Sequence, residues 1–558
     1  MEYLVFCVVA LAVILFIFVQ GKLNEKKQLE CFKKQLREQK GKAPDKEYKI
    51  ERFIRIPGYF EKHQQGFQID DITWNDLGMD DVFRRINYCV SSTGEEVLYH
   101  MLRTPCLEKD QLEHFEEMVF FFSEHEEERI EYQCSMRKLG NTGKYSLYDY
   151  LYYLERLDRH DSKRDILSNL LLVGLIVLTY FDLGMGVASI LVWTLFQLQR
   201  YFKVKNSYEP YLTSLAYIMR MVDVGREVCE ELPEVCKKEK EEIREAVKSL
   251  KKAKKGSIWV FGSLYKTGSP TEVVFDYVRM LFHVDLIYFN HMLNEIMLHK
   301  EQVDRMITAM GTVEAAGSVA MYRASLVQGW CKPEFGEREL LLEGGYHPLL
   351  TNPVKNTIQT SKNVLLTGSN ASGKSTFLKT TALASLLAQT INTVAADRYE
   401  APFYQLYSSM SLKDDLDSGD SYYIVEIKSI KRILDSMEKS EGKILCFVDE
   451  VLRGTNTVER IAASTQILMS MSGERIQCFA ATHDIELTGL LEDYYENYHF
   501  EEEVRDGDVL FNYRLQPGKA TTRNAIKLLE IMGYEQDIIE KARTQADVFL
   551  KQGVWQLS

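Results

Sequence analysis

The chain has 558 residues, and 68 Lys and Arg against 81 Asp and Glu give it a formal net charge of −13. That charge excludes a protein that coats nucleic acid through bulk positive charge, and 46% hydrophobic residues with 11 Pro and 32 Gly exclude a mostly disordered or collagen-like chain. The ten cysteines form no C-x-x-C pair, which excludes a disulfide scaffold and a zinc protein.

The N-terminus is an uncharged apolar segment from Tyr3 to Val19. As a helix it rises roughly 25 Å, enough to cross a bilayer. No basic residue precedes it and no small-x-small cleavage site follows before Lys22, so a membrane anchor is favoured over a cleaved signal peptide. The following basic residues predict a cytoplasmic downstream chain. We therefore expect a transmembrane helix over residues 1–20 and a basic cytoplasmic linker over 21–50.

A second apolar block runs from Ile166 to Leu198, with Asp182 as its only charge. Gly and Asp between Asp182 and Gly186 are turn formers, so we predict a transmembrane helical hairpin over residues 166–199. A buried core hairpin is the alternative, but neither half carries the polar stripe of a soluble core helix. Basic residues at both outer ends place them in the cytoplasm. The expectation is an integral membrane protein with three spans and an external N-terminus.

The regions on either side of this hairpin are predicted to be helical, over residues 51–165 and 200–335. The acidic stretch Glu124–Glu131 is typical of a solvated helix face. The basic stretch Lys248–Lys255 ends a charged helix and is a candidate for phosphate contacts. The apolar segment Thr271–Leu298 carries too many charges for a fourth span, so we expect one long packed helix there.

From residue 336 the pattern changes to alternating strands and helices. Three short apolar runs, Asn363–Thr367, Ile444–Val448 and Gln477–Ala481, each end at a polar cluster, with helical segments between them. This alternation predicts a parallel α/β sheet. Functional residues should then gather at the carboxyl ends of those strands.

The first of these strands leads into G-x-x-x-x-G-K-S, which is followed by an apolar helix. In this setting glycines let backbone N–H groups wrap phosphates, and the helix N-terminus favours negative charge. Lys374 is expected to neutralise the β- and γ-phosphates, and Ser375 to bind Mg²⁺. The predicted ATP-binding residues are Gly368, Ser369, Asn370, Ala371, Ser372, Gly373, Lys374, Ser375 and Thr376.

The other two strands end at acidic and histidine residues. Asp449 is suited to the Mg²⁺ shell, and Glu450 to orienting or deprotonating an attacking water. His483 follows the third strand and is a candidate γ-phosphate sensor. With Lys374, Glu450 and His483 as catalytic candidates, the pattern predicts an ATP hydrolase that uses ATP and Mg²⁺.

The segment from His347 to Ala542 resembles the ATPase domain of the MutS DNA mismatch-repair family. The family's TGPNMGGKST appears as TGSNASGKST over Thr367–Thr376, and its DE-x-x-RGT-x-T begins at Asp449. The family's DD-x-x-x-G-x-STF-x-x-E corresponds to Asp414–Glu426, with Tyr422 and Tyr423 in place of Thr and Phe. FATH corresponds to Ala480–His483, and the upstream HP…N to His347, Pro348 and Asn356. Weaker resemblance to the family's helical core and lever regions covers Ile72–Pro105 and Ala315–Phe335.

The resemblance implies a multidomain α and α/β protein: a helical core over 51–165, a lever over 200–335, a P-loop ATPase over 336–515 and a dimerising helix-turn-helix over 516–558. It implies a homodimer through the ATPase and C-terminal segments, in which Ser421 of one chain contacts ATP held by the other. Nothing before residue 60 can hold the family's mismatch-reading and connector domains.

We therefore expect a membrane-anchored MutS-like ATPase with a cytoplasmic ATPase domain, whose partners are a second copy of the chain, DNA and the lipid bilayer. Branched or structured DNA is expected rather than a single mismatch. Two alternatives remain open. One is an ATP-dependent assembly switch, and the other is the energising subunit of a membrane assembly with no DNA role.

Overall fold

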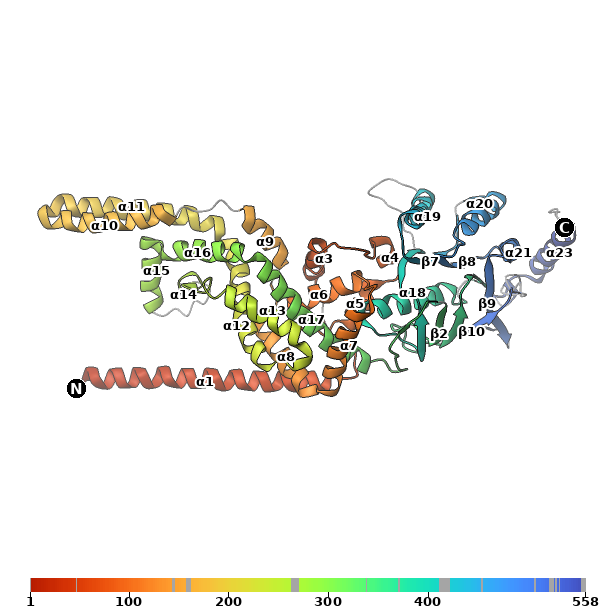
Figure 1. Cartoon of the computed structure of the whole chain (residues 1–558), viewed down its shortest axis with the longest axis horizontal. Coiled ribbons are helices and arrows are strands. Elements are labelled where there is room, and N and C mark those ends of the chain that lie inside the picture. Colours follow the sequence, from red (N-terminus) through yellow and green to blue (C-terminus); the bar gives the residue numbers. More distant parts are fainter. Residues whose placement is uncertain are drawn as a thin grey trace. The chain divides into compact units, whose positions relative to one another are not determined.

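The computed structural model describes residues 2–552 apart from 47, 143–145, 157–161, 262–269, 338, 370–371, 411–421, 453–454, 506–507, 521–525, 527–528 and 531. This part of the chain is a mixture of helical and α/β structure (Figure 1). It divides into two compact units. Unit 1 comprises Met1–Gln64, Ile86–His100 and Glu117–Ala324, and unit 2 comprises Gln65–Arg85, Met101–Glu116 and Ser325–Ser558.

Unit 1 is built from helices. Those formed before the apolar hairpin are α1 (Glu2–Glu38), α2 (Ile50–Arg55), α3 (Gly58–Lys62), α6 (Ser92–Arg103, to His100), α8 (Glu126–Leu139) and α9 (Leu147–Arg156). Those from the hairpin onward are α10 (Ser162–Phe181), α11 (Leu183–Tyr208), α12 (Leu212–Glu231), α13 (Lys237–Ser249), α14 (Ser257–Phe261), α15 (Pro270–Phe282), α16 (Val284–Leu298) and α17 (Lys300–Ala324). Short 3₁₀ turns at Glu209–Tyr211 and Glu234–Cys236 lead into α12 and α13.

The first helix does not stop at the predicted boundary of the anchor. Helix α1 continues to Glu38, through most of the segment expected to be a linker. Its basic second half pairs with α8: Lys33 with Glu131, Arg37 with Glu127 at 2.8 Å, and Lys40 with Glu126 at 2.6 Å. The acidic side chains of α8 nevertheless remain largely exposed, as expected of a solvated helix face: Glu127 is 64% and Glu131 50% exposed.

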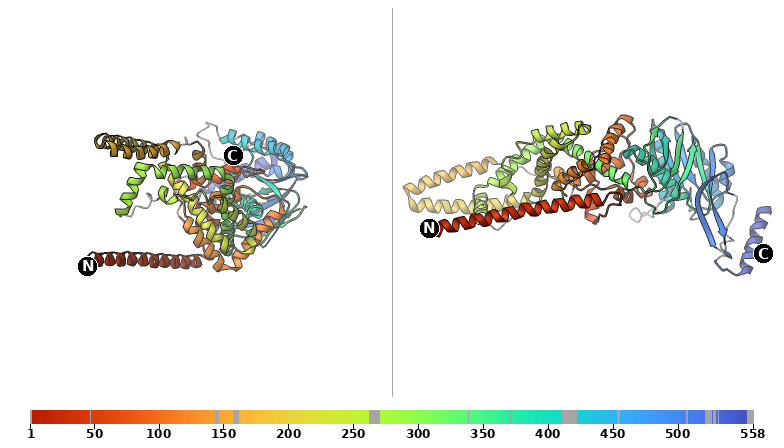
Figure 2. Two further views of the ribbon diagram at one scale, coloured as in Figure 1. Left: turned by 60° about the vertical axis from the view of Figure 1, so that its left-hand side comes forward. Right: turned by 90° about the horizontal axis from the view of Figure 1, so that it is seen from below.

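The hairpin turn predicted at Asp182 is confirmed. Helix α10 ends at Phe181 and α11 begins at Leu183, and the Asp182 carboxylate caps α11 by accepting from the Met185 N–H at 3.0 Å. The two helices lie side by side in both views (Figures 1 and 2). Among the described residues, one helix, Ser162–Phe181, is long enough and apolar enough to cross a membrane. Its apolar 18-residue stretch has a mean hydropathy of 1.6 and is 6% buried.

The single long helix expected over 271–298 is wrong, because the chain breaks at His283. His283 adopts a left-handed conformation (φ 52°) between α15 and α16. Its buried ring lies 2.8 Å from the Asp165 carboxylate through Nδ1 and 3.1 Å from the Gln197 carbonyl through Nε2. Asn169 of α10 donates to the Phe282 carbonyl at 2.8 Å, which satisfies a backbone group that the break leaves without its helical partner. Tertiary hydrogen bonds therefore stabilise the break.

Unit 2 holds both sheets. The first sheet has the order β1-β5-β2-β3, and the second has the order β10-β9-β4-β8-β7-β6. The strands are β1 (Glu334–Phe335), β2 (Leu340–Gly345), β3 (Asn356–Thr360), β4 (Asn363–Thr367), β5 (Arg398–Ala401), β6 (Tyr404–Ser409), β7 (Lys443–Asp449), β8 (Ile476–Ala481), β9 (Tyr495–Arg505) and β10 (Asp508–Pro517). The helices are α4 (Asp71–Asp76), α5 (Met79–Ile86, to Arg85), α7 (Lys109–Glu124, to Glu116), α18 (Lys374–Ile391), α19 (Tyr422–Lys439), α20 (Thr457–Ser470), α21 (Glu486–Leu490) and α23 (Gln536–Gln552).

The three predicted strands are confirmed as β4, β7 and β8. They are neighbours and parallel, with Val364 opposite Phe479 and Val448 opposite Ala480. Every residue of β4 and β8 is buried, as expected of central strands with helices on both faces. Leu365, Val448 and Ala480 pack into a core with residues of α19 and α20. Helix α18 also packs against β7 and β8.

Further strands, which were not predicted, extend the sheet formed by β4, β7 and β8 and build the second sheet. Strand β9 is parallel to β4 and pairs with β10 in a long antiparallel hairpin (Figure 2). The other sheet joins β2 to both β3 and β5 in antiparallel register. Of the C-terminal helix-turn-helix, the structure describes helix α23, and several residues before it lie outside the described part of the chain.

Candidate functional site

The predicted phosphate loop, residues 368–373, joins the carboxyl end of β4 to the first turn of α18. Gly368 (φ 142°) and Gly373 (φ 112°) open and close it in conformations that side chains disfavour. A Cβ at Gly368 would also lie 2.8 Å from the carbonyl oxygen of Phe500. Glycine is therefore required at Gly368 by both backbone conformation and space.

Lys374 begins helix α18 and is 5% exposed. Its ammonium Nζ donates to the carbonyls of Gly368 and Ser369, both at 2.8 Å. The Ser372 hydroxyl beside it is buried and has no hydrogen-bond partner among the described residues. A buried hydroxyl without a partner is costly, and a phosphate oxygen at this loop would supply one. Ser375 and Thr376 are exposed and line the same pocket.

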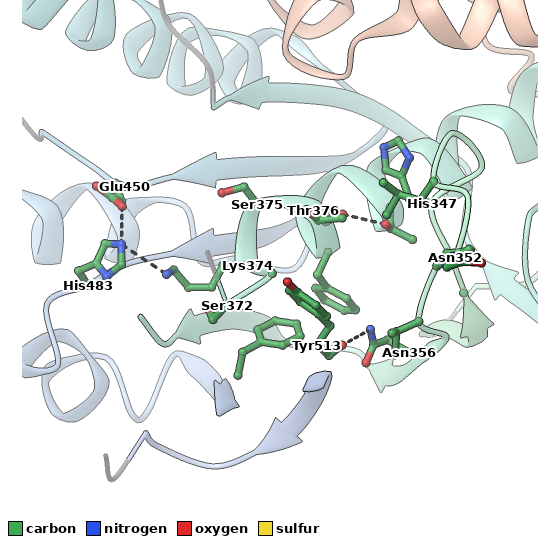
Figure 3. Close-up of a pocket in the computed structure, with 18 residues that line it drawn as sticks. His347, Asn352, Asn356, Ser372, Lys374, Ser375, Thr376, Glu450, His483 and Tyr513 are labelled. Atoms are coloured by element: carbon green, nitrogen blue, oxygen red, sulfur yellow. Dashed lines mark hydrogen bonds and ion pairs between the residues drawn. The ribbon is translucent and has the colours of Figure 1, made fainter. Parts of the chain in front are cut away.

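Glu450 and His483 follow the neighbouring strands β7 and β8. The His483 Nε2 lies 2.8 Å from the Glu450 carboxylate and 3.4 Å from the Lys374 Nζ (Figure 3). One nitrogen cannot both donate to a carboxylate and accept from an ammonium. The shorter distance assigns the Nε2 proton to the bond with Glu450, so the approach of Lys374 is a contact only. The three predicted catalytic residues thus form one chain of contacts.

A pocket of about 660 Å³ joins these groups to a second wall (Figure 3). Glu450, His483 and Lys374 lie at one end, and His347, Asn352 and Asn356 lie at the other. Its lining is Gly345, His347, Leu350, Asn352, Pro353, Val354, Asn356, Ser372, Gly373, Lys374, Ser375, Thr376, Phe377, Thr380, Glu450, His483, Phe500 and Tyr513.

The second wall is uncharged and partly aromatic. Burial, and then the positive charge of Lys379, lower the pKa of His347 to about 4, so its ring is neutral at pH 7. The Asn356 amide donates to the Tyr513 carbonyl at 3.0 Å and accepts from the Leu515 N–H at 2.8 Å. These two hydrogen bonds hold β10 beside Asn356 of β3, and β10 carries Tyr513 to the pocket.

Sequence reasoning had noted His347 and Asn356 only as parts of a motif, and it missed Phe500 and Tyr513. These two aromatic residues come from β9 and β10, far along the chain from the phosphate loop. No local pattern marked them, because only the pairing of β4 with β9 brings them to the loop.

The structure does not gather every predicted site residue. Asp449 is buried at the end of β7 and is not among the pocket-lining residues. Asn370, Ala371 and Ser421 lie outside the described residues. No group of three or more His, Cys, Asp or Glu suited to a metal occurs in the described part. Mg²⁺ at a phosphate site needs none, since one or two protein oxygens, waters and substrate phosphates complete its shell.

The chain resembles known proteins over this same region. The family model for MutS domain V matches residues 364–549, which begin in β4 and end in α23. The DNA mismatch repair protein MutS of Thermus thermophilus is 33% identical over 229 residues. Residues 364–549 of this chain thus resemble MutS domain V. The match to the Thermus thermophilus protein covers 40% of this chain and 28% of the relative.

Two further MutS relatives give the same picture. MutS of Thermus aquaticus is 31% identical over 229 residues, covering 40% of this chain and 28% of that protein. MutS of Thermotoga maritima is 29% identical over 264 residues, covering 46% of this chain and 33% of that protein. The chain thus matches about a third or less of the length of these MutS proteins. The domain V match contains the phosphate loop, Glu450 and His483, and it does not include the hairpin.

Proposed function

We propose that this chain binds ATP with Mg²⁺ in the pocket and hydrolyses it. The observation that carries the proposal is the meeting of three elements in one pocket: a phosphate loop with a buried lysine, a buried hydroxyl at Ser372 without a partner among the described residues, and the Glu450–His483 pair. The match of residues 364–549 to MutS domain V supports the same function.

Each side chain has a distinct role in this proposal. Lys374 exchanges the carbonyls of its own loop for phosphate oxygens, and it neutralises charge that develops on them. Glu450 orients the attacking water and accepts its proton, while His483 holds the Glu450 carboxylate toward the phosphate end of the pocket. Mg²⁺, held by Ser375 and Asp449 together with the phosphates, would supply further charge neutralisation.

The first test is ATP turnover and nucleotide affinity of the purified full-length protein. Lys374→Ala should weaken nucleotide binding, because the phosphates lose their buried cation. Lys362→Ala is the matched control, since Lys362 is exposed and lies outside the pocket. No turnover by the wild-type protein, or unchanged affinity in Lys374→Ala, would contradict the proposal.

We also propose that the ATPase works as a homodimer with composite sites, assembled through the ATPase and C-terminal segments. Family resemblance supports a role in trans for Ser421. Ser421→Ala and Lys374→Ala chains, each with strongly reduced turnover alone, should then regain some activity when mixed, because one of the two composite sites is intact. Mixtures shown to contain heterodimers but lacking activity would argue against a shared site.

We propose DNA as the macromolecular partner, since the relatives are named as DNA mismatch repair proteins. The basic stretch Lys248–Lys255, in unit 1, supplies the charge for phosphate contacts. Binding through phosphates is independent of base sequence and falls steeply with salt. Fluorescence anisotropy at two salt concentrations should show a preference for branched DNA over a duplex with one mispair. A preference for the single mismatch would overturn this specificity.

The last part of the proposal is membrane anchoring through α1 and the α10–α11 hairpin, with the ATPase in the cytoplasm. The apolar and largely exposed surface of the hairpin supports it. In sealed membranes a tag at Gly184 should be labelled from outside, and a tag at Gln556 should be protected. The same exposed hairpin favours the second candidate function, an ATP-dependent switch or energising subunit in a membrane assembly. The absence of binding to every DNA form would favour that candidate.

A further inference from the structure

The segment that carries Glu450 has an unusual backbone. Glu450 (φ 60°) and Leu452 (φ 61°) both adopt left-handed conformations, although neither is glycine. Such conformations are strained for residues other than glycine, and they persist only where their surroundings hold them. The direction of the Glu450 side chain therefore depends on whatever fixes the turn from Asp449 to Leu452.

Several contacts hold this turn. The Glu450 N–H donates to the Ala481 carbonyl at 2.9 Å, and the Ser464 hydroxyl of α20 donates to the Val451 carbonyl at 3.2 Å. Both Val451 and Leu452 are buried in the core between the sheet and its helices. These contacts leave the Leu452 N–H to be satisfied.

Glu426 of α19 satisfies it. The Leu452 N–H donates to the Glu426 Oε1 at 2.5 Å, and the Glu426 side chain is only 2% exposed. A buried carboxylate bound to a backbone N–H is a strong anchor, because charge-assisted hydrogen bonds are stronger than neutral ones. The same face of α19 buries Ile430 and Ile433 in the core that holds Val451 and Leu452. Glu426 thus joins a rigid helix to the strained turn.

The place of Glu426 in α19 gives this bond a consequence. Helix α19 begins at Tyr422, directly after Ser421 in the sequence, and Glu426 lies one turn further along. A displacement of the N-terminus of α19 must therefore move the carboxylate that holds the Leu452 N–H. Leu452 lies two residues beyond Glu450, so the strained turn that carries Glu450 must then adjust.

We infer that Glu426 is a positioning residue that aligns Glu450 through the Leu452 N–H and makes that alignment depend on the position of helix α19. The inference rests on the proposed ATPase function and deepens it. Hydrolysis at one site then responds to whatever residue 421 contacts, which in the proposed dimer is the partner's nucleotide.

The test compares variants at Glu426 for turnover, ATP affinity and hydrogen exchange. Glu426→Ala should lower kcat about tenfold or more, because it removes the acceptor of a buried N–H, while the Kd for ATP stays near that of the wild type. Glu426→Gln keeps an acceptor oxygen and should retain most of the turnover. The Leu452 amide should exchange faster in Glu426→Ala than in Glu426→Gln. Glu438→Ala, an exposed glutamate on the same helix, is the matched control and should change neither quantity.

Coupling to α19 is tested by combination with Ser421→Ala. If both residues act along one path, the double variant loses less kcat than the product of the two single losses. If the kcat loss of the double variant equals the product of the two single losses, the coupling is overturned. Wild-type turnover in Glu426→Ala, or equal losses of kcat and affinity in both the Ala and the Gln variant, would overturn the positioning role. A wild-type protein without turnover would instead refute the proposed function, so the two failures are distinguishable.

Discussion

The phosphate-loop region of unit 2 and the apolar hairpin of unit 1 treat their side chains in opposite ways. Around the loop the charged Lys374 is drawn inward and bonded to backbone carbonyls. Along the hairpin the apolar groups point outward, with Leu167 69% and Tyr180 89% exposed. The first arrangement suits a charged ligand that replaces internal hydrogen bonds, and the second suits non-aqueous surroundings. The same chain thus presents two surfaces of opposite character.

The base of the hairpin reverses this pattern. Asp165 and His283 are fully buried there, and Arg200 lies 3.1 Å from the Asp165 carboxylate. A buried carboxylate with two cationic or polar partners is stabilised only while the partners are present. The outward apolar face therefore ends at an inward polar cluster, which resembles the phosphate-loop region in its chemistry. The following changes test each side of the contrast.

The largest expected effect is on hydrolysis. Glu450→Gln keeps the size of the side chain but cannot accept a proton, so kcat should fall by about 10²–10⁴-fold while nucleotide binding persists. Steady-state turnover and equilibrium nucleotide binding measure the two quantities. Glu474→Gln, an exposed glutamate outside the pocket, should behave as the wild type. Undiminished turnover in Glu450→Gln would remove Glu450 from the mechanism.

The next effect is on the polar cluster at the hairpin base. Asp165→Ala leaves His283 and Arg200 without their shared carboxylate, and should lower the free energy of unfolding by about 3–5 kcal/mol. Denaturant unfolding in detergent measures it. Asp182→Ala is the matched control: it removes one exposed cap at the other end of the hairpin and should cost about 1 kcal/mol. Equal costs would show that the buried cluster adds nothing beyond a cap.

The apolar face is tested with one substitution at two sites of equal exposure. Leu171 of the hairpin and Leu490 of unit 2 are each 55% exposed. An Arg at the centre of a membrane span costs about 2.5–3.5 kcal/mol, so Leu171→Arg should reduce the membrane-integrated fraction. Leu490→Arg should leave that fraction unchanged. Full-length protein found in the soluble fraction without any substitution would contradict the spans themselves.

A smaller effect is the pH dependence of the free energy of unfolding, to which unit 1 contributes through Glu314. Burial raises the pKa of Glu314 in unit 1 from its ordinary 4.5 to about 7. Because the folded state binds this proton more tightly, the contribution is complete below pH 4.5 and is lost as the pH rises to about 7. We expect a loss on the order of 1–3 kcal/mol across that interval. Glu314→Gln should flatten it in urea unfolding of the purified protein, and an unchanged slope would contradict the assignment.

The smallest effect is the contribution of His347, in the pocket wall, to stability. Its pH dependence has the opposite sign to that of Glu314. The pKa of His347 is lowered to about 4, so the folded state binds this proton less tightly than the unfolded state. Its contribution is complete above the ordinary pKa of 6.5 and is lost as the pH falls toward 4. The rate at which a protease cleaves unit 2 reports its stability, and His347→Asn should remove the pH dependence of that rate. A dependence unchanged by the substitution would assign it to other groups.

The parallel strands of unit 2 were predictable because their signals are local. Short apolar runs such as Asn363–Thr367 and Gln477–Ala481 became buried central strands within a residue of the predicted limits. The phosphate loop is likewise a local motif, so Lys374, Glu450 and His483 could be proposed from the sequence and were found together in the pocket.

Features that depend on distant contacts were not predictable. The break at His283 exists because Asp165 and Gln197, far earlier in the chain, hold its ring. The continuation of α1 to Glu38 is supported by ion pairs with α8, which no local pattern reveals. Tyr513 reaches the pocket only through the pairing of β9 and β10 and the bridge from Asn356.

The buried cluster at the hairpin base also sets an order of events while the chain is being made. Asp165 and His283 are 118 residues apart, so at about 5–20 residues per second roughly 6–24 s of synthesis separate the carboxylate from this partner. Arg200 emerges only 200 − 165 = 35 residues after Asp165, within about 2–7 s. The hairpin can therefore compensate its own charge first, through its second helix. His283 then completes the cluster after α15 has been synthesised, and only at that stage does α16 become joined to the hairpin.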